Sequence, residues 1–112
     1  MPAQQHESIL DAAILCAKEC EHCADACLDE NNNMAECIRL CRDCSQMCWV
    51  SAGYISRGSR FIPQIVRSCI EICQACASEC EKHDDDHCQK CAQTCRQAAE
   101  EYQKVANVAG VA

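Results

Sequence analysis

Residues 37–48 read CIRLCRDCSQMC and place four cysteines in twelve residues, with the spacing C-x3-C-x2-C-x3-C. An α-helix turns by about 100° per residue, so steps of four, three and four residues keep these side chains within one stripe about 60° wide. A β-strand would scatter them over both faces, because its side chains alternate. The spacing therefore predicts a helix that carries its thiols on one face.

The same pattern recurs along the chain. One complete copy precedes it and another follows, and a fourth copy has cysteines at its last three positions and Asp84 at its first. Four copies of one unit indicate an internal repeat, and thus four similar helices. The repeated cysteines are Cys16, Cys20, Cys23, Cys27, Cys37, Cys41, Cys44, Cys48, Cys69, Cys73, Cys76, Cys80, Cys88, Cys91 and Cys95.

The residues around the cysteines are mostly helix formers, and neither glycine nor proline interrupts a cysteine segment. Asn33 is the expected N-cap of the second helix, with Glu36 completing a capping box, and Gly58 is the expected residue after its end. Pro63 suits the first turn of the third helix, and the run Asp84–Asp86 suits the start of the fourth, where the helix dipole favours negative charge. We therefore expect helices over about 5–29, 33–57, 63–83 and 85–105.

The connections between these helices are short, which makes sequential neighbours antiparallel. All four cysteine stripes then face one axis. The predicted fold is all-α, an antiparallel up-down-up-down four-helix bundle with a cysteine-lined core, in a single domain over residues 1–112.

The two ends of the predicted axis differ in chemistry. Towards one end the stripes continue into an apolar plug, and towards the other they reach Met34, His83 and Asp84, with His87 nearby. We interpret this polar end as the mouth through which metal reaches the thiols, whereas His6 and His22 lie off the stripes and are expected at the surface. The plug residues are Ile9, Ala13, Ser51, Ile55, Ile62, Val66, Ala98, Tyr102 and Val105.

Composition and charge restrict the class of protein. The net charge of −7 and the lack of a basic stripe argue against a nucleic-acid partner. The first residues, MPAQQHESIL, have no basic start and no apolar segment of the kind that directs export, and no run approaches the roughly 20 apolar residues of a membrane span. We expect a cytoplasmic protein, whose thiols stay reduced; the odd count of 15 cysteines also leaves one over in any full disulfide pairing.

Thiolates along a dry axis select soft or borderline metals. A univalent ion at about one per thiolate leaves a neutral core, whereas Zn²⁺ held by four thiolates carries a buried excess of negative charge, which is costly. Cu(I) also accepts two-coordinate sites, while zinc prefers tetrahedra. The residues therefore favour several Cu(I) ions per chain. The other interpretation of the stripe is that cysteine serves only as a small core hydrophobe.

Two further classes of protein stay open: a redox or iron–sulfur protein, and a metallothionein-like buffer. The CxxC units, such as Cys20/Cys23, also occur in redox proteins, but that motif belongs to a βαβ context and no strand is expected here. An iron–sulfur protein would usually show a closer run of cysteines followed by proline. A metallothionein-like zinc or cadmium buffer shares the thiolate chemistry and differs in the ion. None of these patterns suggests an enzyme.

The three complete C-x3-C-x2-C-x3-C helices and the fourth segment, HDDDHCQKCAQTC, resemble the bacterial copper storage proteins, and the absence of an export signal resembles their cytosolic branch. The resemblance spans about residues 5–106 and implies a four-helix bundle that holds many Cu(I) ions on inward cysteines, associates as a tetramer and has histidines at its open end. It marks all fifteen cysteines as ligands and His83 and His87 as mouth residues. Asp84 departs from the pattern, because a carboxylate is a poor Cu(I) ligand.

Large apolar side chains are also expected outside the core. Leu15 and Trp49 project away from the stripe, and Tyr54 and Phe61 lie near the turn between the second and third helices. Such residues can mark an interface. We expect a homo-oligomer whose partners are copper ions and the molecules that donate or accept them.

Overall fold

The computed structural model describes residues 3–30 and 33–109, which form four α-helices and no strand. The helices are α1 (Ala3–Cys27), α2 (Ala35–Ser56), α3 (Ile62–Cys80) and α4 (Asp86–Ala109). Within the described residues, none of them is apolar over enough of its length to span a membrane. The all-α prediction is confirmed.

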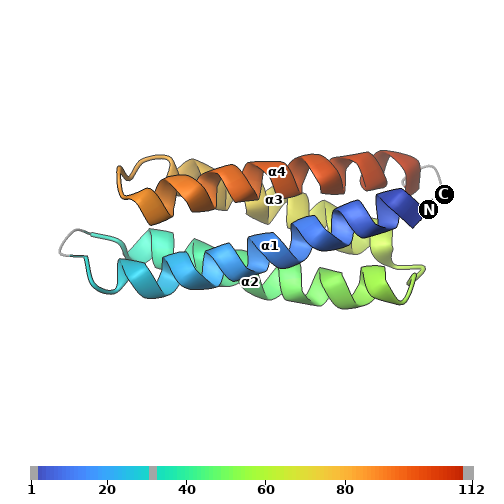
Figure 1. Cartoon of the computed structure of the whole chain (residues 1–112), viewed down its shortest axis with the longest axis horizontal. Helices are drawn as coiled ribbons and strands as arrows, with labels where there is room; N and C mark the ends of the chain where they lie inside the picture. The colour runs from blue at the N-terminus through green and yellow to red at the C-terminus, as the bar shows by residue number, and fades with distance from the viewer. Residues whose placement is uncertain (1–2, 31–32, 110–112) are drawn as a thin grey trace.

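The helices pack as a ring in which each one contacts the helices before and after it in the chain, and α1 contacts α4. Figure 1 shows the end of α1 beside the start of α2 and the end of α3 joined to the start of α4 at one end of the molecule. The α2–α3 connection, the start of α1 and the end of α4 lie at the other end (Figure 1). The arrangement is the predicted antiparallel bundle, about 46 Å long and 18–19 Å across.

The end of α2 follows the predicted stop. Gly58 has a positive φ of 64° and donates its N–H to the Ile55 carbonyl at 3.1 Å, while the Ser59 N–H bonds the Tyr54 carbonyl at 3.0 Å. This pair of bonds is the Schellman motif, in which glycine adopts the left-handed conformation at no side-chain cost. Pro63 also lies in the first turn of α3, as predicted.

The predicted capping box at the start of α2 is wrong. The N-cap is Met34, not Asn33, and no side chain caps the helix. Met34 is buried, with only 3% of its surface exposed, and its carbonyl accepts the Ile38 N–H at 2.9 Å. Burial of an apolar side chain at this position fixes where the helix starts, and it replaces the stabilisation that a polar cap would give.

The α3–α4 connection is longer than the sequence suggested. α3 ends at Cys80, and the N–H groups of Lys82 and His83 bond carbonyls three residues back, those of Glu79 and Cys80. Such bonds tighten the chain away from the α-helical register. His83 therefore leaves the cysteine stripe of α3, and α4 begins only at Asp86.

The end of the bundle opposite this connection is packed by ordinary apolar residues, as predicted. All the expected plug residues are buried: Ile9, Ala13, Ser51, Ile55, Ile62, Val66, Ala98, Tyr102 and Val105. Burial of each large aliphatic side chain contributes about 1.5–3 kcal/mol to folding. This plug therefore holds the bundle together where the axis contains no thiols.

Candidate metal centre

The four helices bring every cysteine of the sequence to one axis. Each of the fifteen thiol side chains has at most 1% of its surface exposed, and all fifteen are free rather than disulfide-bonded. The 4-3-4 spacing produces this arrangement, because it keeps each helix's thiols on the face that meets the other three helices. The core of this protein is therefore a column of sulfur atoms.

The sulfur atoms lie close to one another across helix boundaries. The Sγ–Sγ distance is 3.6 Å for Cys20 and Cys91, which belong to α1 and α4, and 3.6 Å for Cys44 and Cys73, which belong to α2 and α3. Within one helix, Cys16 and Cys20 are 4.0 Å apart. A disulfide bond needs about 2.05 Å. The sulfurs are thus near enough to share a metal ion but are not bonded.

The thiols also form overlapping groups of four whose sulfur atoms all lie within 4.8 Å of one another. Cys16 and Cys44, for example, belong both to a group with Cys20 and Cys95 and to a group with Cys48 and Cys73. Further groups are Cys20/Cys76/Cys91/Cys95, Cys23/Cys27/Cys37/Cys88 and Cys23/Cys37/Cys41/Cys80. Neighbouring groups share members, and the Sγ–Sγ distance of 3.9 Å between Cys41 and Cys91 joins the groups of the two halves of the column, so fourteen of the thiols, all but Cys69, form one connected network.

His87 closes the network at the end of the bundle that holds the α3–α4 connection. Its Nδ1 lies 3.5 Å from the sulfurs of Cys23 and Cys88 and 4.0 Å from that of Cys27. Its Nε2 lies 3.1 Å from Oε1 of Glu30. A carboxylate at Nε2 favours the proton there, which leaves the Nδ1 lone pair directed at the thiols. His87 can therefore bind a metal ion together with the outermost cysteines.

The other predicted mouth residues lie differently. His83 is outside α3, and its Nε2 bonds Oε2 of Glu79 at 2.9 Å, so its prediction as a residue on the stripe is wrong. Asp84 is exposed and precedes α4. Met34 is buried in the core cluster at the same end as His87. The first position of the fourth repeat thus holds no thiol. The imidazole of His87 lies instead against the sulfurs of Cys23 and Cys88.

The remaining two histidines had been expected at the surface. His22 is exposed, as expected. His6 is only partly exposed, and its Nε2 lies 2.8 Å from the Ile55 carbonyl oxygen, so the surface prediction for His6 is wrong. The end of α2 offers this carbonyl because the last carbonyls of a helix lack partners within the helix.

The plug end of the network contains two hydroxyl groups, those of Ser51 and Tyr102, which the sequence predicts only as parts of the apolar plug. Tyr102 Oη lies 3.3 Å from Cys48 Sγ and 2.7 Å from Ser51 Oγ, and all three side chains are fully buried. The signal was available in the sequence, since two polar residues on an apolar seam must find hydrogen-bond partners. The sulfur column therefore ends in an imidazole on one side and in hydroxyls on the other.

Burial raises the pKa of three thiols that lie near the two ends of the column. Burial raises the pKa of the Cys69 thiol from 9.0 to about 11, and it is also the main cause that raises the pKa of Cys27 to about 11. The pKa of Cys88 is raised for the same reason. A dry interior disfavours the charged thiolate. Without metal these thiols hold their protons at neutral pH, so a metal ion that binds them must displace protons.

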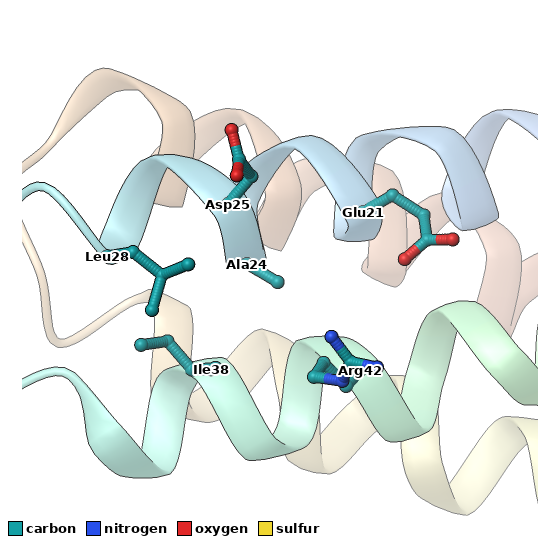
Figure 2. Close-up of a pocket in the computed structure, with 6 residues that line it drawn as sticks. All are labelled: Glu21, Ala24, Asp25, Leu28, Ile38 and Arg42. Atoms are coloured by element: carbon teal, nitrogen blue, oxygen red, sulfur yellow. The ribbon is translucent and has the colours of Figure 1, made fainter.

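The outer surface shows apolar residues where the sequence predicted them. Leu15 is 46% exposed, Trp49 44% and Phe61 46%, whereas Tyr54 is partly buried. Figure 2 shows a groove between α1 and α2, lined by no cysteine, where Leu28 and Ile38 lie opposite each other and Glu21 lies opposite Arg42. Leu28 at the edge of this groove is 68% exposed. The outer face of α1 and α2 thus exposes several large apolar side chains to solvent.

Comparison with known proteins gives matches along nearly the whole chain. A family described as "copper storage protein" matches residues 2–107. The sequence is 40% identical over 105 residues to the cysteine-rich protein YhjQ of Bacillus subtilis (strain 168), covering 92% of this chain and 97% of that protein.

Two solved structures are also similar to this chain. The Cu(I)-bound copper storage protein BsCsp3 has a TM-score of 0.87 and 39% identity, over 91% of this chain and 98% of the other. A mutant of Ccsp from Streptomyces lividans has a TM-score of 0.88 and 28% identity, over 96% of both chains.

Proposed function

The chain belongs to the copper storage protein family, and we propose that it is a cytosolic store that holds many Cu(I) ions on the thiolates along its axis. All fifteen cysteines serve as ligands in this proposal. The protein carries out no turnover; it sequesters copper and keeps a reserve.

The observation that carries this proposal is the connectivity of the buried thiols. A sulfur that belongs to two groups at once can bridge two ions, as Cys16 and Cys44 can. Bridging by univalent ions at about one per thiolate leaves the column neutral, whereas divalent ions in the same shared groups leave buried charge uncompensated. The column therefore suits Cu(I) filling from one end to the other.

Copper enters this column at the His87 end in the proposed mechanism. The imidazole Nδ1 and the thiols of Cys23 and Cys88 form a mixed site where an arriving ion first meets sulfur. Met34 supplies a soft thioether nearby, and His83 and Asp84 shape the polar approach. Each ion that moves inward replaces thiol protons, which leave to solvent.

The partners of this store are the molecules that give and take Cu(I). A reduced cytosol keeps the thiols free to bind metal, which supports this location. Nucleic acid is not a partner in this proposal, because the net charge of −7 opposes phosphate binding.

A homotetramer is part of the proposal. The exposed Leu15, Trp49 and Phe61 support association of copies through the outer helix faces. Light scattering of the reduced chain at micromolar concentration tests this point: four times the monomer mass of 12.4 kDa is expected. A monomeric mass would contradict it.

Titration of the reduced, metal-free chain with Cu(I), in anaerobic buffer against a chromophoric Cu(I) chelator, tests the function. We expect roughly 15 equivalents to bind before the chelator gains colour, about one per cysteine. An endpoint of one or two equivalents would contradict a store. The protein should stay colourless, whereas a brown colour after isolation would indicate an iron–sulfur cluster.

A parallel titration with Zn²⁺ and Cd²⁺ separates the copper store from a metallothionein-like buffer. We expect Cu(I) to displace either divalent ion completely, because only the univalent ion leaves the shared thiolates without excess charge. Retention of zinc in the presence of equimolar Cu(I) would favour the buffer.

A further inference from the structure

Tyr102, Ser51 and Cys48 form a closed hydrogen-bonded ring at the plug end of the sulfur column. Tyr102 Oη lies 2.7 Å from Ser51 Oγ and 3.3 Å from Cys48 Sγ. Ser51 Oγ in turn donates to the Cys48 carbonyl oxygen at 2.9 Å. None of the three side chains is exposed to solvent, so these groups satisfy their hydrogen bonds within the core, where the buried thiol of Cys69 also lies near Ser51 and Tyr102.

The direction of the hydrogen bond between Tyr102 and Cys48 suits a metal-bound sulfur. Each hydroxyl has one proton to donate and can accept as well. In the metal-free structure Tyr102 Oη donates to the neutral sulfur of Cys48, and Ser51 Oγ donates to the Cys48 carbonyl oxygen. When Cys48 binds a metal ion, its sulfur loses its proton and becomes a charged acceptor, so the hydrogen bond that Tyr102 already donates becomes stronger.

The position of Cys48 explains why a hydrogen-bond donor to its sulfur is useful. Cys48 lies next to the apolar plug, and its sulfur is 3.9 Å from that of Cys73, with which it shares a group of four thiols. A sulfur at the end of a column has metal neighbours on one side only, so it keeps more negative charge than a bridging sulfur inside the column. A hydrogen bond to a charged acceptor is about twice as strong as a neutral one, and a dry interior strengthens it further.

We propose that Tyr102 and Ser51 are positioning residues of a distinct Cu(I) site at Cys48, in which the Tyr102 hydroxyl donates a hydrogen bond to the metal-bound sulfur. This inference rests on the proposed copper storage. On binding, the Cys48 S–H bond breaks, an S–Cu(I) bond forms and the proton leaves to solvent. The copper stays univalent, and the Tyr102 hydroxyl keeps donating its hydrogen bond to the sulfur. The closed end of the column thus stabilises the last ion with hydroxyls, as His87 completes the site at the open end.

The direct test observes the hydroxyl itself. Cu(I) is diamagnetic, so NMR of the chain labelled with ¹³C at the tyrosine Cζ atoms can follow its only two tyrosines, Tyr54 and Tyr102, through the titration. The Cζ shift reports on hydrogen-bond donation by the phenol. We expect the Tyr102 signal to move as the last equivalents bind and the Tyr54 signal to stay in place, because Tyr54 lies against Arg57 on the outside of α2.

The matched variants are Tyr102→Phe and Tyr54→Phe, which remove one hydroxyl each. Tyr102→Phe should weaken binding of the last ion about ten-fold or more, the effect of losing a hydrogen bond to a charged group, while the earlier ions bind as before. Tyr54→Phe should titrate like the wild type. Ser51→Ala serves as a second variant: it should also weaken the last ion, because the Tyr102 hydroxyl then loses the hydrogen-bond partner that holds it in place beside Cys48.

The outcomes separate this inference from the function on which it rests. A wild-type chain that binds only one or two ions would overturn the copper store and this site together. A wild-type chain that takes its full load, with an unmoved Tyr102 signal and with last-ion affinities unchanged in Tyr102→Phe and Ser51→Ala, would overturn this inference alone.

Discussion

His87 is the residue through which the thiol column meets the polar end of the bundle. Its Nδ1 is 3.5 Å from two cysteine sulfurs, while Glu30 holds the opposite ring nitrogen at 3.1 Å. A ligand of borderline softness at this place can accept Cu(I) from a carrier and release it to thiolate. In the proposed mechanism His87 affects the rate of transfer rather than the capacity, because the fifteen thiols are present without it.

We therefore predict that His87→Ala slows Cu(I) transfer from a chelator into the metal-free chain several-fold and leaves the endpoint nearly unchanged. His83→Ala is the matched comparison: His83 lies on the polar approach but bonds Glu79 and not the thiols, so this variant should slow transfer less than His87→Ala. Stopped-flow absorbance of the chelator complex measures both rates. Equal rates for the wild type and His87→Ala would contradict the role of His87, and slowing by His83→Ala alone would assign that role to the other histidine.

At the residue scale, the sequence predicted the positions of the cysteines better than those of the residues at the polar end of the bundle. The position of each cysteine follows from helical periodicity alone, and all fifteen lie on the axis. The placement of His83 depended instead on where α3 ends, and a shift of three residues removed it from the stripe. The hydroxyls of Tyr102 and Ser51 were placed correctly on the seam, but their contact with Cys48 depends on side-chain geometry across two helices, which spacing does not specify.

The end of α2 depends on the backbone conformation of one glycine, Gly58. Gly58 adopts a φ of 64° after α2, and a Cβ added there would meet no atom within 4 Å. We predict that Gly58→Ala destabilises the metal-free bundle by about 1 kcal/mol, because an L-residue is strained in the left-handed region. The loss comes from the backbone alone. Thermal or urea unfolding followed by circular dichroism measures it.

Gly53→Ala provides a control of opposite sign. Gly53 lies inside α2, where alanine is favoured over glycine by about 0.5–1 kcal/mol, and its new Cβ would meet only the flexible end of Arg57, at 3.2 Å. This variant should be as stable as the wild type or more so. Both variants should keep the full copper endpoint. A Gly58→Ala chain that unfolds like the wild type would show that the turn tolerates another backbone conformation.

At the element scale, residues that restrict the backbone predicted helix boundaries correctly, whereas the predicted side-chain cap did not. The glycine after α2 and the proline in α3 each restrict the backbone, so the structure retains them. The Asn33–Glu36 capping box offered about 1 kcal/mol, which the burial of Met34 can exceed. Tertiary contacts of this kind cannot be read from a local pattern.

For the molecule as a whole, the protonation of the buried thiols links stability to pH and to metal. Burial holds the pKa of Cys69 at about 11, against 9.0 for the ordinary thiol. The folded chain thus keeps this proton up to a higher pH than the unfolded chain does. The resulting stabilisation is complete below about pH 9 and is lost as pH rises towards 11. One such thiol contributes on the order of 2–3 kcal/mol.

We predict that the melting temperature of the reduced, metal-free chain falls between pH 9 and 11. The melting temperature of the Cys69→Ser variant should fall less, because serine does not ionise in this range. The Cu(I)-loaded chain should show no such loss, since its thiols have already given up their protons to the metal. Its own loss should come at acidic pH, where protons compete for the thiolates. Circular dichroism melts of the three samples across both ranges measure these effects. An alkaline loss that is equal in the loaded and metal-free chains would show that groups other than the thiols cause it.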